Sequence, residues 1–148
     1  MNENNLSSNK KQVAYVRTSA YGPKDDLKDQ LSYIRQYANA QGIVLDEEIS
    51  DIDSGLNYKR QKWNNLLDEV MNDKIDKIYI TSKDRFTRFG YGWLENLCKK
   101  HGTKIIVLTK TGTSSDKELV NDLISIIRVF LCRLYDLRKY KKKSLNGD

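Results

Sequence analysis

Apolar and polar positions follow two different spacings along this chain, and each spacing predicts one kind of element. Four short apolar runs predict buried β-strands, at residues 12–17, 43–50, 76–82 and 103–110. Between them, apolar residues recur three or four positions apart, which is the spacing of one helix face. Helices are predicted on this basis in 24–42, in the segment carrying Trp63, Leu66, Leu67, Val70 and Met71, and in 93–102. The polar segments 51–59 and 83–92 are predicted as loops.

Strands that alternate with helices predict an α/β domain, because right-handed crossovers between parallel strands place helices against the sheet. We therefore expect a three-layer sandwich with a mostly parallel central sheet of about four to five strands. Residues 12–113 would form this core. The polar segments 1–11 and 144–148 are expected to be disordered.

The last predicted element, residues 114–143, differs from the others because it is one long helical segment without an internal Pro. It carries two adjacent apolar stripes. One stripe consists of Leu119, Leu123, Ile126, Phe130, Leu134 and Leu137, and the other of Val120, Ile124, Ile127 and Leu131. This arc is too wide for a helix that packs on one sheet, so we expect a second chain or a second helix to cover part of it.

The distal half of the same segment is strongly basic. Its cations are Arg128, Arg133, Arg138, Lys139, Lys141, Lys142 and Lys143, against the single acid Asp136. A solvated tail is one interpretation of such a run. The other is a helix that forms a homodimer through its apolar root and contacts DNA phosphates through its tip. The DNA-binding candidates are Arg133, Arg138, Lys139, Lys141 and Lys142.

Composition limits the class of protein without identifying it. The 148 residues suit one domain, and 39% apolar with 31% charged residues is typical of a soluble globular protein. The formal net charge of +6 favours a polyanionic partner. Cys98 and Cys132 lack metal-like spacing, so we expect reduced, buried thiols in a cytoplasmic protein. Neither a signal peptide nor a membrane span is written in the sequence.

Candidate chemistry gathers in the loops that follow the first three strands. These loops carry Arg17 and Ser19; Ser54, Asn57 and Arg60; and Lys83, Asp84, Arg85 and Arg88. Because the carboxyl ends of parallel strands share one edge of the sheet, we expect these side chains to meet. The single histidine, His101, precedes the fourth strand and belongs to the opposite edge. A Ser-His-Asp triad is therefore not expected.

A serine among arginines suits attack on a phosphodiester, since guanidinium groups match phosphate oxygens and stabilise charge that builds up during attack. Ordinary surface charge is the plain alternative. A metal-dependent nuclease is another, because Asp51, Asp53 and Asp84 lie on the same edge. Neighbouring cations would repel a metal ion, so we predict no metal site; Asp25 and Asp26 are interpreted as charges that begin a helix.

These loops resemble the catalytic domain of the serine recombinases, the resolvase/invertase family, and within it the transposases of small insertion elements. The segments that carry the resemblance are YVRTS, DLKDQ, DSGLNYKR, KDRFTRFG and the C-terminal DLISIIRVFLCRLYDLRKYK. Together they span nearly all of residues 12–143. The resemblance implies a resolvase-like fold and a site-specific recombinase or transposase that cleaves and rejoins DNA strands.

The resemblance also implies a role for each matching residue. Ser19 would be the nucleophile that becomes joined to the 5′ phosphate, and Asp84 would orient the arginines that polarise that phosphate. Those arginines are Arg17, Arg85 and Arg88. Supporting contacts would come from Arg60, Ser54, Gln30 and Lys83. The family uses neither metal nor ATP, so no cofactor is expected.

The resemblance further implies DNA as partner, a dimer that assembles to a tetramer at synapsis, and a nucleoid-associated protein of prokaryotic type. The chain departs from the family pattern at two points. Pro23 occupies the position where the family often has glutamine. Only eleven residues precede the first strand, where such transposases carry a helix-turn-helix domain, so an isolated or truncated catalytic domain is expected. A non-catalytic, DNA- or phosphate-binding remnant is the remaining alternative.

Overall fold

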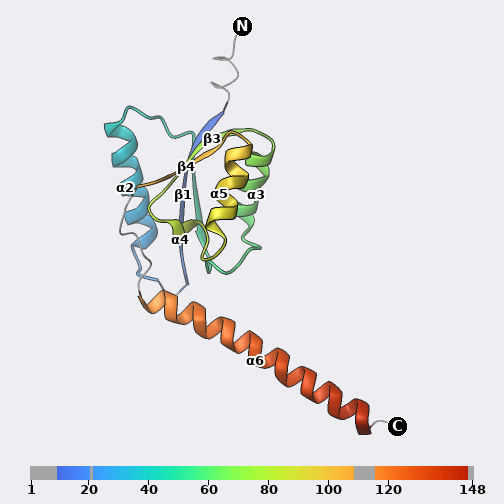
Figure 1. Ribbon diagram of the computed structural model, residues 1–148. Coiled ribbons are helices and arrows are strands. Elements are labelled where there is room, and N and C mark those ends of the chain that lie inside the picture. Colours follow the sequence, from blue (N-terminus) through green and yellow to red (C-terminus); the bar gives the residue numbers. More distant parts are fainter. Residues whose placement is uncertain (1–9, 21, 109–115, 147–148) are drawn as a thin grey trace. The chain divides into compact units, whose positions relative to one another are not determined.

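The computed structural model describes residues 10–20, 22–108 and 116–146 (Figure 1). The chain divides into two compact units, Met1–Ser114 and Ser115–Asp148. Each unit is therefore described by itself. The disorder predicted for residues 1–11 falls mostly on residues 1–9, which lie outside the described part, whereas Lys11 already belongs to a strand.

The first unit is built on a parallel sheet. Its strands are β1 (Lys11–Thr18), β2 (Glu47–Ile52), β3 (Ile75–Ile80) and β4 (Lys104–Val107), in the order β2-β1-β3-β4. All three pairings are parallel, as the alternation of strands and helices predicted. β1 lies inside the sheet, and six of its eight residues are buried, which is typical of a strand covered on both faces.

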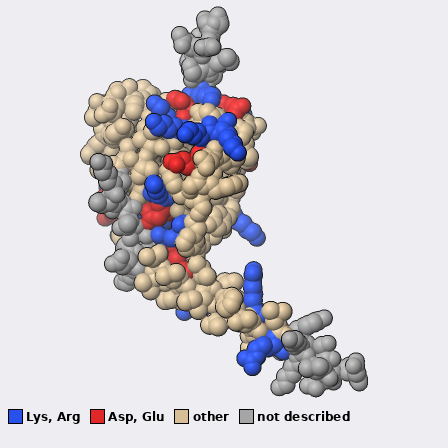
Figure 2. Space-filling view, in the orientation of Figure 1, with Lys and Arg blue, Asp and Glu red and all other residues tan. Residues whose placement is uncertain are grey.

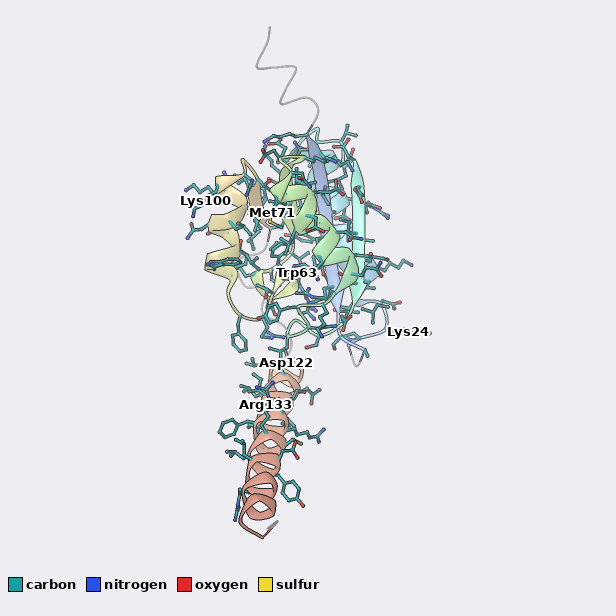
Figure 3. All side chains as sticks on the ribbon, turned by 90° about the vertical axis from the view of Figure 1, so that its right-hand side faces the viewer. Lys24, Trp63, Met71, Lys100, Asp122 and Arg133 are labelled. Carbon is teal, nitrogen blue, oxygen red and sulfur yellow. The ribbon has the colours of Figure 1, made fainter. Side chains whose placement is uncertain are left out.

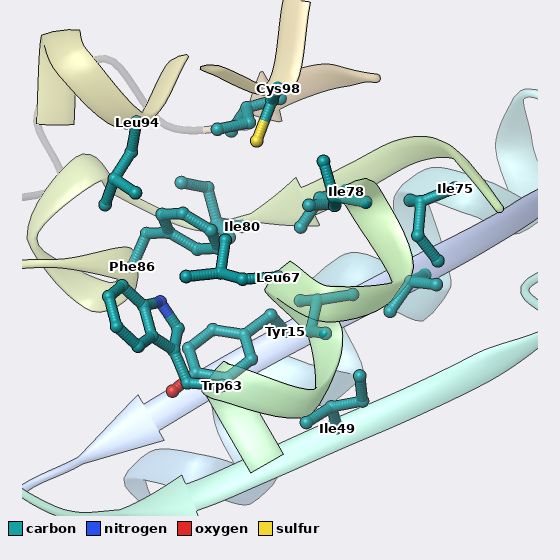
Figure 4. Close-up of a cluster of buried hydrophobic side chains, with 14 residues drawn as sticks. Tyr15, Ile49, Trp63, Leu67, Ile75, Ile78, Ile80, Phe86, Leu94 and Cys98 are labelled. Carbon is teal, nitrogen blue, oxygen red and sulfur yellow. The ribbon is translucent and has the colours of Figure 1, made fainter. Parts of the chain in front are cut away.

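Helices cover both faces, which confirms the three-layer sandwich. α2 (Asp26–Ala40) lies on one side, and α3 (Gln61–Met71) and α5 (Tyr91–Lys100) lie on the other (Figure 1). The latter two face the viewer in Figure 3. The core accordingly has two parts. A large cluster under α3 and α5 includes Tyr15, Trp63 and Phe86 (Figure 4), and a smaller one under α2 is formed by Ala14, Val16, Ile34 and Tyr79.

Several element boundaries differ from the prediction. β2 begins at Glu47 rather than residue 43, because Val13 near the start of β1 pairs with Glu47. The apolar residues Ile43 and Leu45 pack against the smaller core cluster without joining the sheet. Segment 83–92, predicted as loop, contains the four-residue helix α4 (Lys83–Phe86) and the start of α5.

The two cysteines also differ from each other. Cys98 on α5 is fully buried, as predicted, and burial raises the pKa of its thiol to about 11. Cys132 is exposed in its own unit, so the prediction of two buried thiols was wrong for this residue. Met71, predicted on the same face of α3 as Trp63 and Val70, is exposed at the end of that helix (Figure 3).

The second unit is the single helix α6 (Asp116–Asn146), which extends past the predicted end at residue 143. Side chains are described for residues 119–138. Apolar residues on both predicted stripes are exposed in this unit, among them Leu123, Ile127, Phe130 and Leu134. None of the described helices is both long and apolar enough to cross a membrane.

Candidate active site

Arg17 connects three elements at the carboxyl edge of the sheet. Its side chain is fully buried, and its guanidinium donates to three backbone carbonyls. The distances are 2.9 Å to Asp53, 2.8 Å to Asp84 and 3.2 Å to Arg85. Since Asp53 follows β2 and the other two lie in α4, Arg17 joins β1 to both neighbouring loops. The three loops therefore meet, as the sheet topology predicted.

Gln30 fixes the backbone of Arg17 from the other side. Its side-chain amide donates to the Arg17 carbonyl at 2.9 Å, and its side-chain oxygen accepts from the Arg17 amide at 3.3 Å. Gln30 is itself buried in α2. This pair of hydrogen bonds satisfies both backbone groups of a buried strand residue and joins α2 to the end of β1.

Asp84 and Arg88 lie together on and just after α4. One carboxylate oxygen of Asp84 accepts from the Ser82 hydroxyl at 2.6 Å, and the other lies 3.4 Å from Nη1 of Arg88. The Arg88 backbone amide donates to the carbonyl of Gly55 at 3.2 Å. Both side chains are largely buried. Asp84 is thus placed to limit the orientations of Arg88.

Arg85 lies nearest to the protein surface among the three predicted phosphate-binding arginines, with 13% of its side chain exposed. It donates to the carbonyl of Arg17 at 3.2 Å and contacts the carboxylate of Asp26 at 3.1 Å. Asp26, the first residue of α2, had been interpreted only as a helix-start charge. Its contact with Arg85, 59 positions away, has no signal in the local sequence pattern.

Arg60, which the sequence pattern places in the loop after the second strand, has a buried side chain. It is 1% exposed and donates to the Tyr15 hydroxyl at 2.9 Å and to the carbonyls of Phe86 and Asn57, both at 2.8 Å. Its guanidinium carbon lies 4.3 Å from the centre of the Trp63 ring. Burial lowers the pKa of Arg60, although the contact with Tyr15 opposes this shift. Arg60 is therefore part of the core beneath the site.

Tyr15 and Asp51 complete this buried network, and neither had been predicted in this role. The Tyr15 hydroxyl donates to Asp51 at 2.7 Å, and the same carboxylate oxygen accepts from the Trp63 amide at 3.1 Å. Burial is the main reason that the pKa of Tyr15 is raised. The sequence does contain a signal for this contact. Polar groups in buried strands need hydrogen-bond partners, and β1 and β2 each carry one such residue, Tyr15 and Asp51.

Ser19 lies directly after β1, beside Arg17 in sequence, and is partly buried. Its carbonyl accepts from the Gly22 amide at 3.0 Å, which closes a turn. A side chain at Gly22 would collide with the Thr18 hydroxyl, so this turn requires glycine. Ser19 therefore stands at the edge where Arg17, Arg85 and Arg88 gather. Pro23 follows this turn and is exposed.

The remaining predicted residues have local or peripheral contacts. The Ser54 hydroxyl accepts from the Leu56 amide at 3.1 Å and shapes the loop after β2. Lys83 is exposed, and its ammonium group lies 5.1 Å from the centre of the Tyr91 ring. Arg133 and Arg138 are exposed on α6, and Figure 3 labels Arg133. The side chains of Lys139, Lys141 and Lys142 lie outside the described residues.

The acidic residues of this edge have separate partners. Asp51 faces Tyr15, Asp84 faces Ser82, and Asp53 accepts from the Asn57 side chain at 2.9 Å. Across the described ranges, no three His, Cys, Asp or Glu side chains form a group able to hold a metal ion.

His101 lies at the opposite edge of the sheet, as predicted. Its Nδ1 atom is 3.0 Å from the Asp73 carboxylate, and Asp73 precedes β3. A Ser-His-Asp triad with Ser19 is therefore not formed.

Comparison with known proteins shows which family the chain resembles. A family model described as the resolvase N-terminal domain matches residues 12–145. The catalytic domain of ISC1926 TnpA, an IS607-like serine recombinase, is 40% identical with a TM-score of 0.77, covering 90% of this chain and 92% of that one. A serine recombinase from Sulfolobus solfataricus is 36% identical with a TM-score of 0.78, covering 87% and 88%.

A similar relative among known sequences is a protein of Acanthamoeba polyphaga mimivirus that is named as a resolvase. It is 30% identical over 143 residues, which cover 95% of this chain and 73% of the viral protein. The residues matched by the family model include nearly all of β1 and of α6, together with the loop after β2 and α4; these elements bear the site and form the long helix. The chain therefore belongs to the resolvase family and is the catalytic domain of a serine recombinase.

Proposed function

We propose that this chain cleaves and rejoins DNA through a covalent bond between Ser19 and a 5′ phosphate. The observation that carries the proposal is the gathering of Arg17, Arg85 and Arg88 at the end of β1, next to Ser19. Guanidinium groups stabilise the charge that builds up on phosphorus during nucleophilic attack. The arginines thereby serve in place of a histidine base near the serine.

The reaction would run in two balanced steps. The Ser19 hydroxyl loses its proton and attacks phosphorus, a phosphoserine bond forms, and the 3′ oxygen leaves as a hydroxyl. In the second step, a 3′ hydroxyl from another strand attacks the same phosphorus, and Ser19 regains its proton. Because one phosphate ester replaces another, no energy source is required.

The arginines would have different roles, according to how deeply each side chain is buried. Arg85 and Arg88 retain some surface exposure and would contact the phosphate oxygens. Arg17 is enclosed and bonded to carbonyls, so it would contribute a fixed positive field and hold the loops in place. Arg60 would support the site from the core, with Asp84, Gln30 and Ser54 as positioning residues.

The first prediction concerns Ser19→Ala. This variant should form no covalent protein–DNA adduct on a nicked suicide substrate carrying the recombination site of the element, because the attacking oxygen is gone. The parent chain should form an adduct that survives denaturation. Adducts would be detected by denaturing electrophoresis and mapped by mass spectrometry. Ser32→Ala, an exposed serine on α2, is the matched control and should retain the adduct.

The outcomes separate this proposal from its alternatives. An adduct in Ser19→Ala would exclude Ser19 as nucleophile. Loss of cleavage in EDTA would indicate a metal-dependent nuclease, for which the separately partnered carboxylates give no support. DNA binding by the parent without any adduct would indicate a binding remnant.

We also propose that residues 12–113 act as the catalytic core and that residues 114–143 serve oligomerisation and DNA contact. The apolar stripes of α6 suit a homodimer, which would assemble to a tetramer when two DNA sites are brought together. Figure 2 shows Lys and Arg in the distal part of α6, beyond a largely uncharged stretch. Arg133 and Arg138 would contact DNA, and Lys139, Lys141 and Lys142, which follow in the sequence, are further candidates for this contact.

A cytoplasmic, nucleoid-associated location follows from this proposed role. The prokaryotic setting expected from the sequence remains a prediction, because similar proteins come both from mycobacteria and from a giant virus.

A further inference from the structure

The contact between Arg85 and Asp26 places an anion of the protein on an arginine of the active site. Nη1 of Arg85 lies 3.1 Å from one carboxylate oxygen of Asp26, and Nη2 lies 3.4 Å from the other. The two side chains are 13% and 15% exposed. The pair is thus neither sealed in the core nor free in solvent, and a ligand at this edge can reach it.

The pair is loosely formed for an arginine and a carboxylate. The Asp26 oxygen at 3.1 Å accepts no aligned hydrogen bond in the described structure, and the second contact is near the upper limit for one. Arg35 and Glu48 show the tight alternative in the same chain, with two bonds of 2.6 and 2.7 Å. The contact between Arg85 and Asp26 therefore depends mainly on charge, and Arg85 can exchange this partner for one with better geometry.

A DNA phosphate offers that better geometry. Two phosphate oxygens can accept parallel hydrogen bonds from one guanidinium group, as a well-placed carboxylate does. Nη1 of Arg85 also donates to the carbonyl of Arg17 at 3.2 Å, and the same nitrogen lies 3.1 Å from Asp26. The carboxylate and the phosphate would therefore compete for the same donors.

Asp26 is also close to the nucleophile along the chain. It is the first residue of α2, and one connection, residues 19–25, joins it to the end of β1 where Ser19 lies. In the absence of DNA it offsets one positive charge in a cluster that includes Arg17 and Arg88.

We propose that Asp26 is a positioning residue that occupies Arg85 while the site is empty and yields it to the scissile phosphate. This inference rests on the proposed function for the identity of the phosphate. It makes Asp26 an internal competitor, so its removal strengthens phosphate binding instead of weakening it. A residue that merely supported the fold would have the opposite effect.

The test is a titration of the full chain with inorganic phosphate, followed through the Arg85 Nε–H signal in the NMR spectrum and assigned with Arg85→Lys. Asp26→Asn should lower the dissociation constant about fivefold, the size expected when a partly exposed competing ion pair is removed. Asp26→Glu keeps the negative charge and should remain close to the parent chain.

Asp29→Asn is the matched control. Asp29 lies in the same first turn of α2 and is exposed. Its substitution by Asn removes the same negative charge as Asp26→Asn. It should change phosphate affinity by less than half as much as Asp26→Asn on a logarithmic scale, because solvent screens an exposed charge that has no contact with Arg85. Equal effects of the two substitutions, or weaker binding in Asp26→Asn, would overturn the inference.

A second variant guards against loss of the fold. Asp26→Ser keeps a residue type that favours a helix start and should tighten phosphate binding in the same way. With DNA, Asp26→Asn and Asp26→Ser should both lower the DNA concentration that gives half-maximal adduct formation, since a competitor of binding is removed.

Failure of this inference and failure of the proposed reaction are distinguishable. The phosphate titration needs no DNA cleavage and can be run in a Ser19→Ala background. Tighter phosphate binding without any adduct in the parent would support Asp26 as competitor and reject the reaction. Adducts from the parent with unchanged phosphate affinity in both Asp26 variants would reject the competitor and retain the reaction.

Discussion

Two arginines at the carboxyl edge of the sheet are enclosed by protein, and their hydrogen bonds explain how this is tolerated. A buried guanidinium costs several kcal/mol unless its donors are paired. Arg17 donates to three carbonyls, and Arg60 donates to two carbonyls and a hydroxyl. Each arginine therefore fixes the loops around it.

Gly55 makes this arrangement possible at one crowded point, which gives a prediction. A Cβ atom there would lie 3.2 Å from Nη2 of Arg17 and 3.2 Å from Cβ of Arg88. Gly55→Ala should therefore destabilise the chain by about 1–2 kcal/mol, because a packed site must shift to admit the methyl group. It should also slow adduct formation, since both arginines move.

Urea unfolding and the adduct assay measure the two effects. Gly92→Ala is the matched control, because this glycine stands inside α5 and a Cβ atom added to it would meet no other atom within 4 Å. That substitution should leave stability unchanged or raise it by roughly 0.5–1 kcal/mol. If Gly55→Ala changed neither the free energy of unfolding nor adduct formation, the site would have enough space for the methyl group.

At this scale the sequence predicted the residues that the topology brings together, including Arg17, Asp84, Arg85 and Arg88. It did not predict Asp26 as a partner of Arg85, because a contact across 59 positions leaves no local pattern. It also placed Arg60 in a surface loop. Its burial depends on Tyr15 and Trp63, which periodicity identifies only as core residues.

Among the elements, α4 was missed because four residues are too short to show a helical period. Its position depends on long-range bonds: Arg17 donates to the carbonyls of Asp84 and Arg85, and Arg60 donates to that of Phe86. The prediction of β2 was shifted for a related reason. Apolar residues at 43–45 showed burial, but only the pairing with β1 determines where the strand begins.

The dependence of α4 on Arg60 gives a further prediction. Arg60→Met keeps the length of the side chain but leaves Tyr15 and the carbonyls of Phe86 and Asn57 without their donor. We expect a loss of about 3 kcal/mol in the free energy of unfolding, as when one partner of a buried polar network is removed. Urea unfolding measures this loss.

Arg35→Met is the control for Arg60→Met, since Arg35 forms a tight ion pair with Glu48 that is largely exposed on the arginine side. It should change stability little, because solvent screens such pairs. Equal losses in the two variants would mean that Arg60 has no structural role beyond that of a surface ion pair.

In the molecule as a whole, the catalytic core and α6 are separate compact units, and α6 exposes an apolar surface within its unit. The long helix was predictable because its segment lacks Pro and repeats two apolar stripes. What covers the apolar surface of this helix was not predictable. The stripes show that the surface needs to be covered, but they do not show how many chains cover it.

Phe130→Glu tests the homodimer that we propose. A charge in an apolar interface is costly to bury, so this variant should be monomeric where the parent chain is dimeric. Sedimentation equilibrium at several concentrations measures the mass. Ser125→Glu, at a polar position of the same helix outside both stripes, should remain dimeric. A monomeric parent, or a dimeric Phe130→Glu, would contradict a dimer formed through this surface.

The acceptors of Arg17 have a consequence for how the family can diverge. They are backbone carbonyls, and every amino acid supplies one, whatever its side chain. Asp53 can thus be replaced during evolution without removing the oxygen that Arg17 binds. A substitution at Asp53 that keeps the course of the backbone therefore leaves all three hydrogen bonds of Arg17 in place.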